Sequence, residues 1–142
     1  MTKEAIDSTF NYDVEQRQIE SLRIRALQKD ANDVSLVARE KGAVLGFARL
    51  KIKDKAVEWI SMYVKPDHVG KGIGTALWKS ASKRLPPELP IIVEVATYTK
   101  AVQFYKTIGF IDTGERTSAC ITEDCRVAIP LMRLIFSSRP KI

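Results

Sequence analysis

Apolar residues follow a strand-like pattern in four segments of the chain. Ser35–Arg39, Ala43–Ile52 and Ala56–Val64 are rich in β-branched and aromatic residues, and short polar turns separate them. Such runs predict an antiparallel meander. Ile91–Ala96 is an apolar run that follows a proline-rich stop, and it predicts a buried strand.

The strand Ala56–Val64 has two distinct faces. With regular alternation, Val57 and Trp59 face one side, whereas Glu58, Met62 and Val64 face the other. A bulge near the end of this strand would change that assignment.

Two later segments have the helical period of three to four residues. The first contains Ile73, Ala76, Leu77, Ala81 and Leu85. The second contains Ala101, Phe104, Tyr105 and Ile108, and Gly109 follows it as a helix C-cap would. Because the first helix joins Ala56–Val64 to Ile91–Ala96, these two strands are expected to pair in parallel.

The first thirty residues give a weaker helical pattern. Tyr12–Lys29 is polar, with Ile19, Leu22 and Ala26 spaced by three and four residues. The segment predicts one surface helix.

The C-terminal part predicts a hairpin. Its strands would be Phe110–Glu115 and Val127–Leu134, around the loop Thr117–Arg126. Pro130 predicts that part of the second strand lies at a sheet edge or in a bulge, because proline has no N–H to donate to a neighbouring strand.

The length of 142 residues fits a single domain. We expect this domain to span residues 1–136 and residues 137–142 to form a flexible tail. No run of eighteen apolar residues occurs, and the N-terminus lacks a basic region followed by an apolar one. These features predict a cytoplasmic protein that does not enter a membrane.

The cysteines and the histidine are too few for a zinc site, so we expect no metal. Cys120 and Cys125 are close in sequence, whereas the single histidine, His68, is distant from both. We expect free thiols rather than a disulfide.

The formal net charge of +6 favours anionic partners. The basic residues are scattered among acids without an aromatic–basic stripe, which disfavours a nucleic acid as the partner. A soluble basic surface is the simpler interpretation.

A glycine-rich loop connects Val64 to the first predicted helix. Gly70, Gly72 and Gly74 allow close approach of a ligand, and the helix N–H groups that follow provide an anion site. The spacing fits neither the nucleoside-triphosphate loop nor the dinucleotide fingerprint. An ordinary glycine-rich turn into a helix is the alternative.

The loop Val69-Gly70-Lys71-Gly72-Ile73-Gly74 resembles the acyl-CoA pyrophosphate loop of the GCN5-related N-acetyltransferase (GNAT) superfamily, Gln/Arg-x-x-Gly-x-Gly/Ala. Val69 departs from the first position of that pattern. Ala101–Phe110 is similar to a second signature of the superfamily, a helix that ends in Phe-Tyr and is followed by Gly-Phe. Tyr98 stands where many members have asparagine.

The resemblance implies a GNAT fold, which is an α/β (α+β) architecture with a mixed, mostly antiparallel sheet, a central parallel strand pair and flanking helices. It implies acetyl-CoA as cosubstrate, with direct attack by a primary amine in a ternary complex. The cofactor-binding residues it implies are Met62, Tyr63, Val64, Val69, Gly70, Lys71, Gly72, Ile73, Gly74, Thr75 and Tyr98. A backbone N–H near Val64 would hold the thioester carbonyl. The resemblance leaves a homodimer open.

Tyr105 and Glu58 are the candidate catalytic residues. In the superfamily, a tyrosine at the position of Tyr105 protonates the departing thiolate; a core aromatic is the structural alternative. Glu58 would take the proton of the amine, directly or through water, or would be a solvated strand charge.

The acceptor amine is not defined by the sequence. Glu123 and Asp124, with Asp30 and Asp33, are expected near the acceptor side, where carboxylates would attract a cation. A non-catalytic acyl-CoA-binding module and a basic nucleic-acid-binding protein are the rival hypotheses.

Overall fold

The computed structural model describes residues 22–27 and 30–137. Its strands form one seven-stranded mixed sheet in the order β1-β2-β3-β4-β5-β7-β6. The strands are β1 (Leu22–Ala26), β2 (Asp33–Glu40), β3 (Ala43–Ile52), β4 (Val57–Val64), β5 (Ile91–Ala96), β6 (Ile111–Cys120) and β7 (Ala128–Phe136). The helical elements are η1 (Pro66–His68), α3 (Ile73–Ser82) and α4 (Ala101–Thr107).

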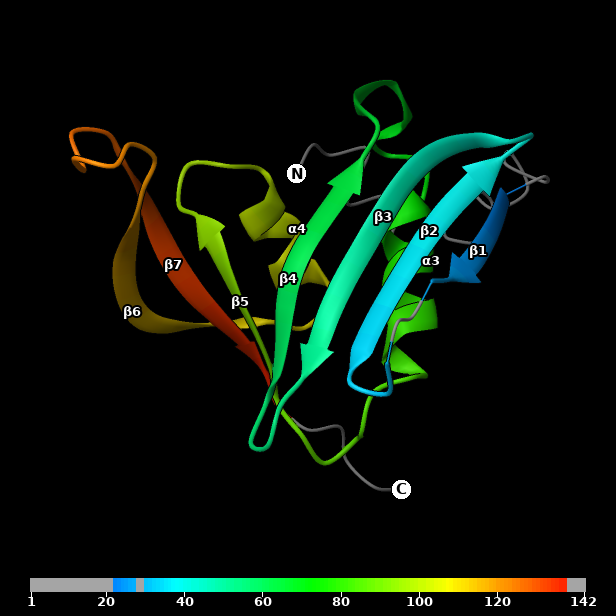
Figure 1. Cartoon of the computed structure of the whole chain (residues 1–142), viewed down its shortest axis with the longest axis horizontal. Helices are drawn as coiled ribbons and strands as arrows, with labels where there is room; N and C mark the ends of the chain where they lie inside the picture. Colours follow the sequence, from blue (N-terminus) through cyan, green and yellow to red (C-terminus); the bar gives the residue numbers. More distant parts are fainter. Residues whose placement is uncertain (1–21, 28–29, 138–142) are drawn as a thin grey trace.

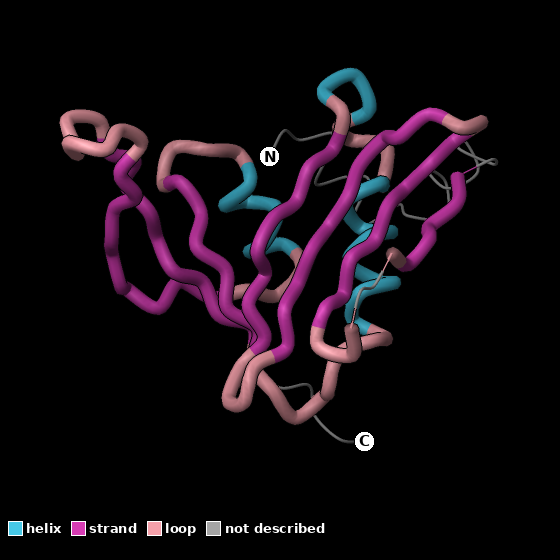
Figure 2. The backbone as a smooth tube through the Cα atoms, viewed as in Figure 1, coloured by secondary structure: helices cyan, strands magenta, loops and turns pink. Residues whose placement is uncertain are grey.

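The predicted meander and the predicted parallel pair are confirmed. Strands β2, β3 and β4 pair antiparallel in sequence order. Strands β4 and β5 pair in parallel, but their register contains only Val57↔Ile91 and Glu58↔Ile92. Beyond these pairs the two strands diverge, which divides the sheet into two arms (Figure 2).

Both α-helices lie on the same side of the sheet, behind it in Figure 1. The predicted stripe is buried, with Ile73, Leu77 and Ala81 in α3 and Leu85 just beyond its end. An aromatic cluster fills the core below the divergence, with neighbouring ring centroids between 5.0 and 5.9 Å apart. Its members are Trp59, Trp78, Tyr105, Phe110 and Phe136.

A β-bulge changes the face presented by the second half of β4. Arg49 pairs with Ser61 while Leu50 pairs with Trp59, so Ile60 is the extra residue. Met62 and Val64 therefore share the helix face with Trp59. The prediction from regular alternation, which placed them with Glu58, is wrong for this reason.

The helix predicted over Tyr12–Lys29 is wrong where the structure describes it, because Leu22–Ala26 is strand β1. Leu22 and Ile24 pack against the core at a period of two, and β1 pairs antiparallel with β2. Pairing with β2 and burial of Leu22 and Ile24 determined the structure here, although apolar residues spaced by three and four had predicted a helix. Residues 12–21 and 28–29 of that prediction lie outside the described residues.

The C-terminal hairpin is confirmed, with differences in its details. Strand β6 continues to Cys120, beyond the predicted end. Strand β7 lies between β5 and β6, but its first residues, 128–130, pair with β6 alone, so Pro130 lies at a local edge as predicted. It lies just past the last β5 pair, Ala96↔Leu131, where a missing N–H leaves the β5 ladder intact.

The expectation of free thiols is wrong, since Cys120 and Cys125 form a disulfide. The end of β6 and the turn before β7 bring their Cα atoms to 4.9 Å, a normal distance for a disulfide. Of the predicted tail, residues 138–142 lie outside the described residues.

Candidate active site

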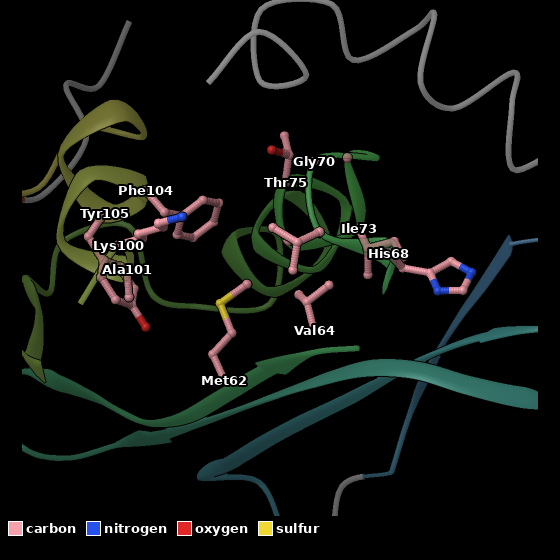
Figure 3. Close-up of a pocket in the computed structure, with 13 residues that line it drawn as sticks. Met62, Val64, His68, Gly70, Ile73, Thr75, Lys100, Ala101, Phe104 and Tyr105 are labelled. Carbon is pink, nitrogen blue, oxygen red and sulfur yellow. The ribbon is translucent and has the colours of Figure 1, made fainter. Parts of the chain in front are cut away.

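A cavity of about 320 Å³ lies between the end of β4 and the N-terminal ends of α3 and α4. Figure 3 shows Met62 and Val64 rising from β4 toward Phe104 and Ile73, whereas the ring of His68 points away from them. The lining residues are Met62, Val64, His68, Val69, Gly70, Gly72, Ile73, Gly74, Thr75, Lys100, Ala101, Phe104 and Tyr105. Both sequence motifs therefore line one space.

The glycine loop adopts torsions that require glycine. Gly70 has φ of 86° and Gly72, the N-cap of α3, has φ of 84°. The first bond of the helix runs from the Ala76 N–H to the Gly72 carbonyl at 2.9 Å. The N–H groups of Ile73, Gly74 and Thr75 consequently have no carbonyl partner within the helix and form the positive end of its dipole.

Gly74 is needed for a different reason, which is close packing. A Cβ at this position would lie 2.9 Å from Met62 Cε and 3.2 Å from Phe104 Cε1. The absence of a side chain lets α3 approach both β4 and α4. This approach sets the width of the cavity.

The open edge of β4 supplies further backbone donors. The Lys65 N–H donates to the Leu45 carbonyl at 2.7 Å, so Lys65 points its N–H toward β3. Because N–H directions alternate along a strand, those of Val64 and Met62 point toward the β5 side. Strand β5 has already diverged there.

Among the described residues, Tyr105 is the one tyrosine that lines this cavity. Its side chain is only 5% exposed, and its ring packs edge-on against Trp59 with centroids 5.0 Å apart. Burial raises the pKa of the Tyr105 phenol. The Tyr105 hydroxyl is therefore protonated at neutral pH.

A second cavity, of about 880 Å³, involves the opposite face of β4. Glu58 lies there and forms an ion pair with Lys53 at 3.2 Å. Glu94 also lines it, accepts a hydrogen bond from Thr117 at 2.9 Å and pairs with Arg133 at 3.4 Å. Trp59 lines this second cavity and contacts Tyr105 of the first, so one strand separates the two.

The acidic residues expected near the acceptor divide between two places. Asp33 pairs with Lys51 at the far end of β3, whereas the open end of β4 pairs with Gly46. Asp33 is buried and ion-paired with Arg49 at 3.6 Å, and neither Asp30 nor Asp33 lines either cavity. Glu123 and Asp124 lie in the exposed β6–β7 turn, at the end of the sheet where β4 and β5 diverge (Figure 1).

Sequence comparison decides the family. The family model of the acetyltransferase (GNAT) domain matches residues 1–120. The chain belongs to the GNAT acetyltransferase family. No curated protein matches the chain significantly.

Solved GNAT structures share the fold. An IAA acetyltransferase from Bacillus cereus aligns with a TM-score of 0.65 and 19% identity, over 82% of this chain and 99% of that one. The ribosomal-protein-S18-alanine N-acetyltransferase from Escherichia coli aligns with a TM-score of 0.67 and 14% identity, over 85% and 96%. A GNAT acetyltransferase from Elizabethkingia anophelis with acetyl-CoA bound gives 0.64 and 14%, over 83% and 99%.

In this GNAT domain, most of the residues predicted to bind the cofactor meet in the first cavity. Tyr63, Lys71 and Tyr98 do not line it: Tyr63 faces the opposite side of β4 and Tyr98 is 69% exposed. Four lining residues were not predicted, although the second motif contained two of them. These are His68, Lys100, Ala101 and Phe104.

Two further findings concern metals and membranes. Within residues 22–27 and 30–137, no group of three or more metal-ligating side chains comes together. No helix in that part of the chain is long and apolar enough to cross a bilayer.

Proposed function

We propose that this GNAT acetyltransferase moves an acetyl group from acetyl-CoA to a primary amine. It would use Tyr105 of α4 and Glu58 of β4, which lie on opposite sides of the β4 strand. The observation that carries the proposal is the convergence of the glycine loop, the open edge of β4 and the buried phenol on one cavity. The amine attacks directly in a ternary complex.

The N-terminus of α3 would hold the cosubstrate's pyrophosphate. The backbone N–H groups from Gly70 to Thr75 supply donors and the helix dipole favours the anion. Val69 lines the loop without a polar side chain, so the donors there are backbone groups. Exposed Lys71 would add long-range attraction without direct contact.

The divergence of β4 and β5 would receive the acyl end. Acetyl-CoA, when bound, supplies an activated thioester. The N–H groups of Met62 and Val64 point into this gap and would stabilise negative charge on a carbonyl oxygen. Tyr63 directs its N–H at β3 and its side chain at the opposite face, so it supplies no donor to this gap.

Tyr105 would donate the proton needed by the leaving thiolate. Its ring is fixed between Trp59 and Phe110, with centroids at 5.0 and 5.5 Å, so the phenol is positioned before the substrate binds. Burial raises the pKa of the phenol, which keeps it protonated before the thiolate forms but makes it a weaker acid than an exposed tyrosine.

The amine would approach from the second cavity. Glu58 is the carboxylate on that face nearest in sequence to the β4 bulge, and Lys53 holds it at 3.2 Å. It would accept the ammonium proton directly or through water. Asp54 and Glu94 line the same cavity, and Lys53, Lys55 and Arg133 balance its three carboxylates.

The proposal covers one catalytic domain over residues 1–136 and a cytoplasmic location. Cys120 and Cys125 form a disulfide in the structure. Both lie in the exposed hairpin tip and neither lines either cavity, so the chemistry does not depend on their state.

The experiment is a steady-state assay of acetyl transfer to a panel of polyamines, amino-sugars and peptides, with wild type, Tyr105→Phe and Glu58→Gln. Tyr105→Phe should lose about 10²-fold in kcat while CoA affinity, measured by calorimetry, stays unchanged. Unchanged kcat would remove the acid role. If Glu58→Gln retains its rate, ordered water is the base.

A further inference from the structure

The face of the sheet opposite the helices contains a basic cavity that acetyl transfer does not use. The cavity has a volume of about 590 Å³ and is formed by the β1–β2 edge and the β2–β3 turn. Its lining includes four basic side chains and no acidic one. The lining residues are Arg23, Ile24, Arg25, Arg39, Lys41 and Gly42.

The strand register concentrates this positive charge. Arg23 of β1 lies directly opposite Arg39 of β2, and Arg25 follows two residues after Arg23 on the same face. Like charges placed directly opposite each other destabilise a sheet. None of these side chains forms an ion pair with another described residue. An external anion would relieve the repulsion.

An exposed aromatic pair lies on the same face, in the row that contains Arg25. Arg25 pairs with Val37, Val37 with Phe47, and Phe47 with Tyr63. The rings of Phe47 and Tyr63 stack with centroids 5.7 Å apart, and the two residues are 38% and 43% exposed. Large apolar surface is thus left open beside concentrated positive charge.

This face is separate from the cofactor cavity. Val34, Leu36 and Ala38 alternate with Val37 and Arg39 along β2 and are buried toward α3, which places the arginines on the other side. In Figure 1, α3 and α4 lie behind the sheet, and β1 to β4 present the facing surface. CoA in the first cavity and a ligand at the basic cavity can therefore be bound at the same time.

We propose that this face of β1–β4 binds a single-stranded nucleic acid. Phosphates contact Arg23, Arg25, Arg39 and Lys41, and bases stack on Phe47 and Tyr63. Arg25 and Phe47 lie two strand spacings apart, about 10 Å, so a segment of a few nucleotides spans both groups.

The aromatic pair favours a nucleic acid over an acidic peptide. Carboxylates would need only the cations, whereas a stacked, solvent-facing pair provides surface for planar bases. The net charge of +6 would add attraction for a polyanion. The sequence alone did not reveal this combination of basic and aromatic residues, because they come from four strands and one turn.

Fluorescence anisotropy with a labelled twelve-nucleotide oligouridine RNA, titrated from low to high salt, tests the proposal. Four phosphate contacts predict a slope of log K against log salt of about −3, and Arg23→Ala/Arg39→Ala should halve it. Phe47→Leu/Tyr63→Leu should weaken binding about tenfold or more without changing that slope. Lys83→Ala/Arg84→Ala, at the end of α3, removes the same charge from the helix side and is the matched control.

Several results would overturn the proposal. These are no binding at low salt, equal losses in the arginine variant and its control, and unchanged affinity in the leucine variant. Competition by polyglutamate as effectively as by unlabelled RNA would assign the face to acidic peptides instead. CoA affinity and the melting temperature verify that each variant is folded, since the cofactor cavity lies on the other side of β4.

Discussion

Replacing Gly72 by alanine tests whether the left-handed N-cap of α3 is required. Gly72 has φ of 84° and ψ of 5°, where an L-residue with a Cβ costs about 1–2 kcal/mol. For a chain of this size, each kcal/mol lowers the melting temperature by about 2–4 °C, so Gly72→Ala should melt about 2–8 °C below wild type. Gly72→Asn should lose less, because asparagine tolerates the left-handed region better.

The same substitution should affect the cosubstrate more than the chemistry. If the backbone relaxes to a negative φ, the N–H groups at the start of α3 turn away from the loop. We expect KM for acetyl-CoA to rise several-fold while kcat with saturating acetyl-CoA changes little. Circular dichroism melts, with and without CoA, and initial rates measure the two effects. A Gly72→Ala protein with unchanged melting temperature and unchanged KM would refute the assigned role of this torsion.

Three further predictions follow from packing and protonation. Gly74→Ala places a Cβ 2.9 Å from Met62 Cε and should raise KM for acetyl-CoA with little change in melting temperature; unchanged KM would show that Met62 yields freely. Trp59→Leu opens the aromatic cluster and should lower the free energy of unfolding by about 2–4 kcal/mol, measured in urea, and should also lower kcat because the Tyr105 ring loses its edge-on neighbour. Because burial raises the pKa of Tyr105, the folded state keeps the phenol protonated where the unfolded chain ionises. The stability that this protonated phenol contributes is fully present below about pH 10, the ordinary pKa of tyrosine, and declines as the pH rises above that value. Tyr105→Phe should therefore flatten the alkaline decline of the melting temperature measured from about pH 8 to 11.

The sequence was most informative where one local pattern determined the structure. The buried stripe of α3 from Ile73 to Ala81 and Gly109 just after the α4 C-cap, with φ of 116°, were both predictable. Burial of one helix face and a left-handed helix end each favour distinct residue types. Residues of both motifs line the first cavity.

The sequence was least informative where register decided the outcome. The bulge at Ile60 rotated Met62 and Val64 to the helix face, and no residue type marks that insertion. Leu22 and Ile24 form an edge strand only because β2 is beside them. The basic cavity likewise depends on Arg23 meeting Arg39 across two strands.

The short seam between β4 and β5 also has a consequence for amide hydrogen exchange. Strand β4 is paired along β3 as far as Val64, but only Val57 and Glu58 pair with β5. Alternate amides in its second half, at Met62 and Val64, therefore exchange without strand protection, whereas that of Tyr63, directed at β3, is protected. A ligand in the gap would slow exchange of the Met62 and Val64 amides but not of the Tyr63 amide. Deuterium uptake at these three residues therefore reports whether the gap is occupied.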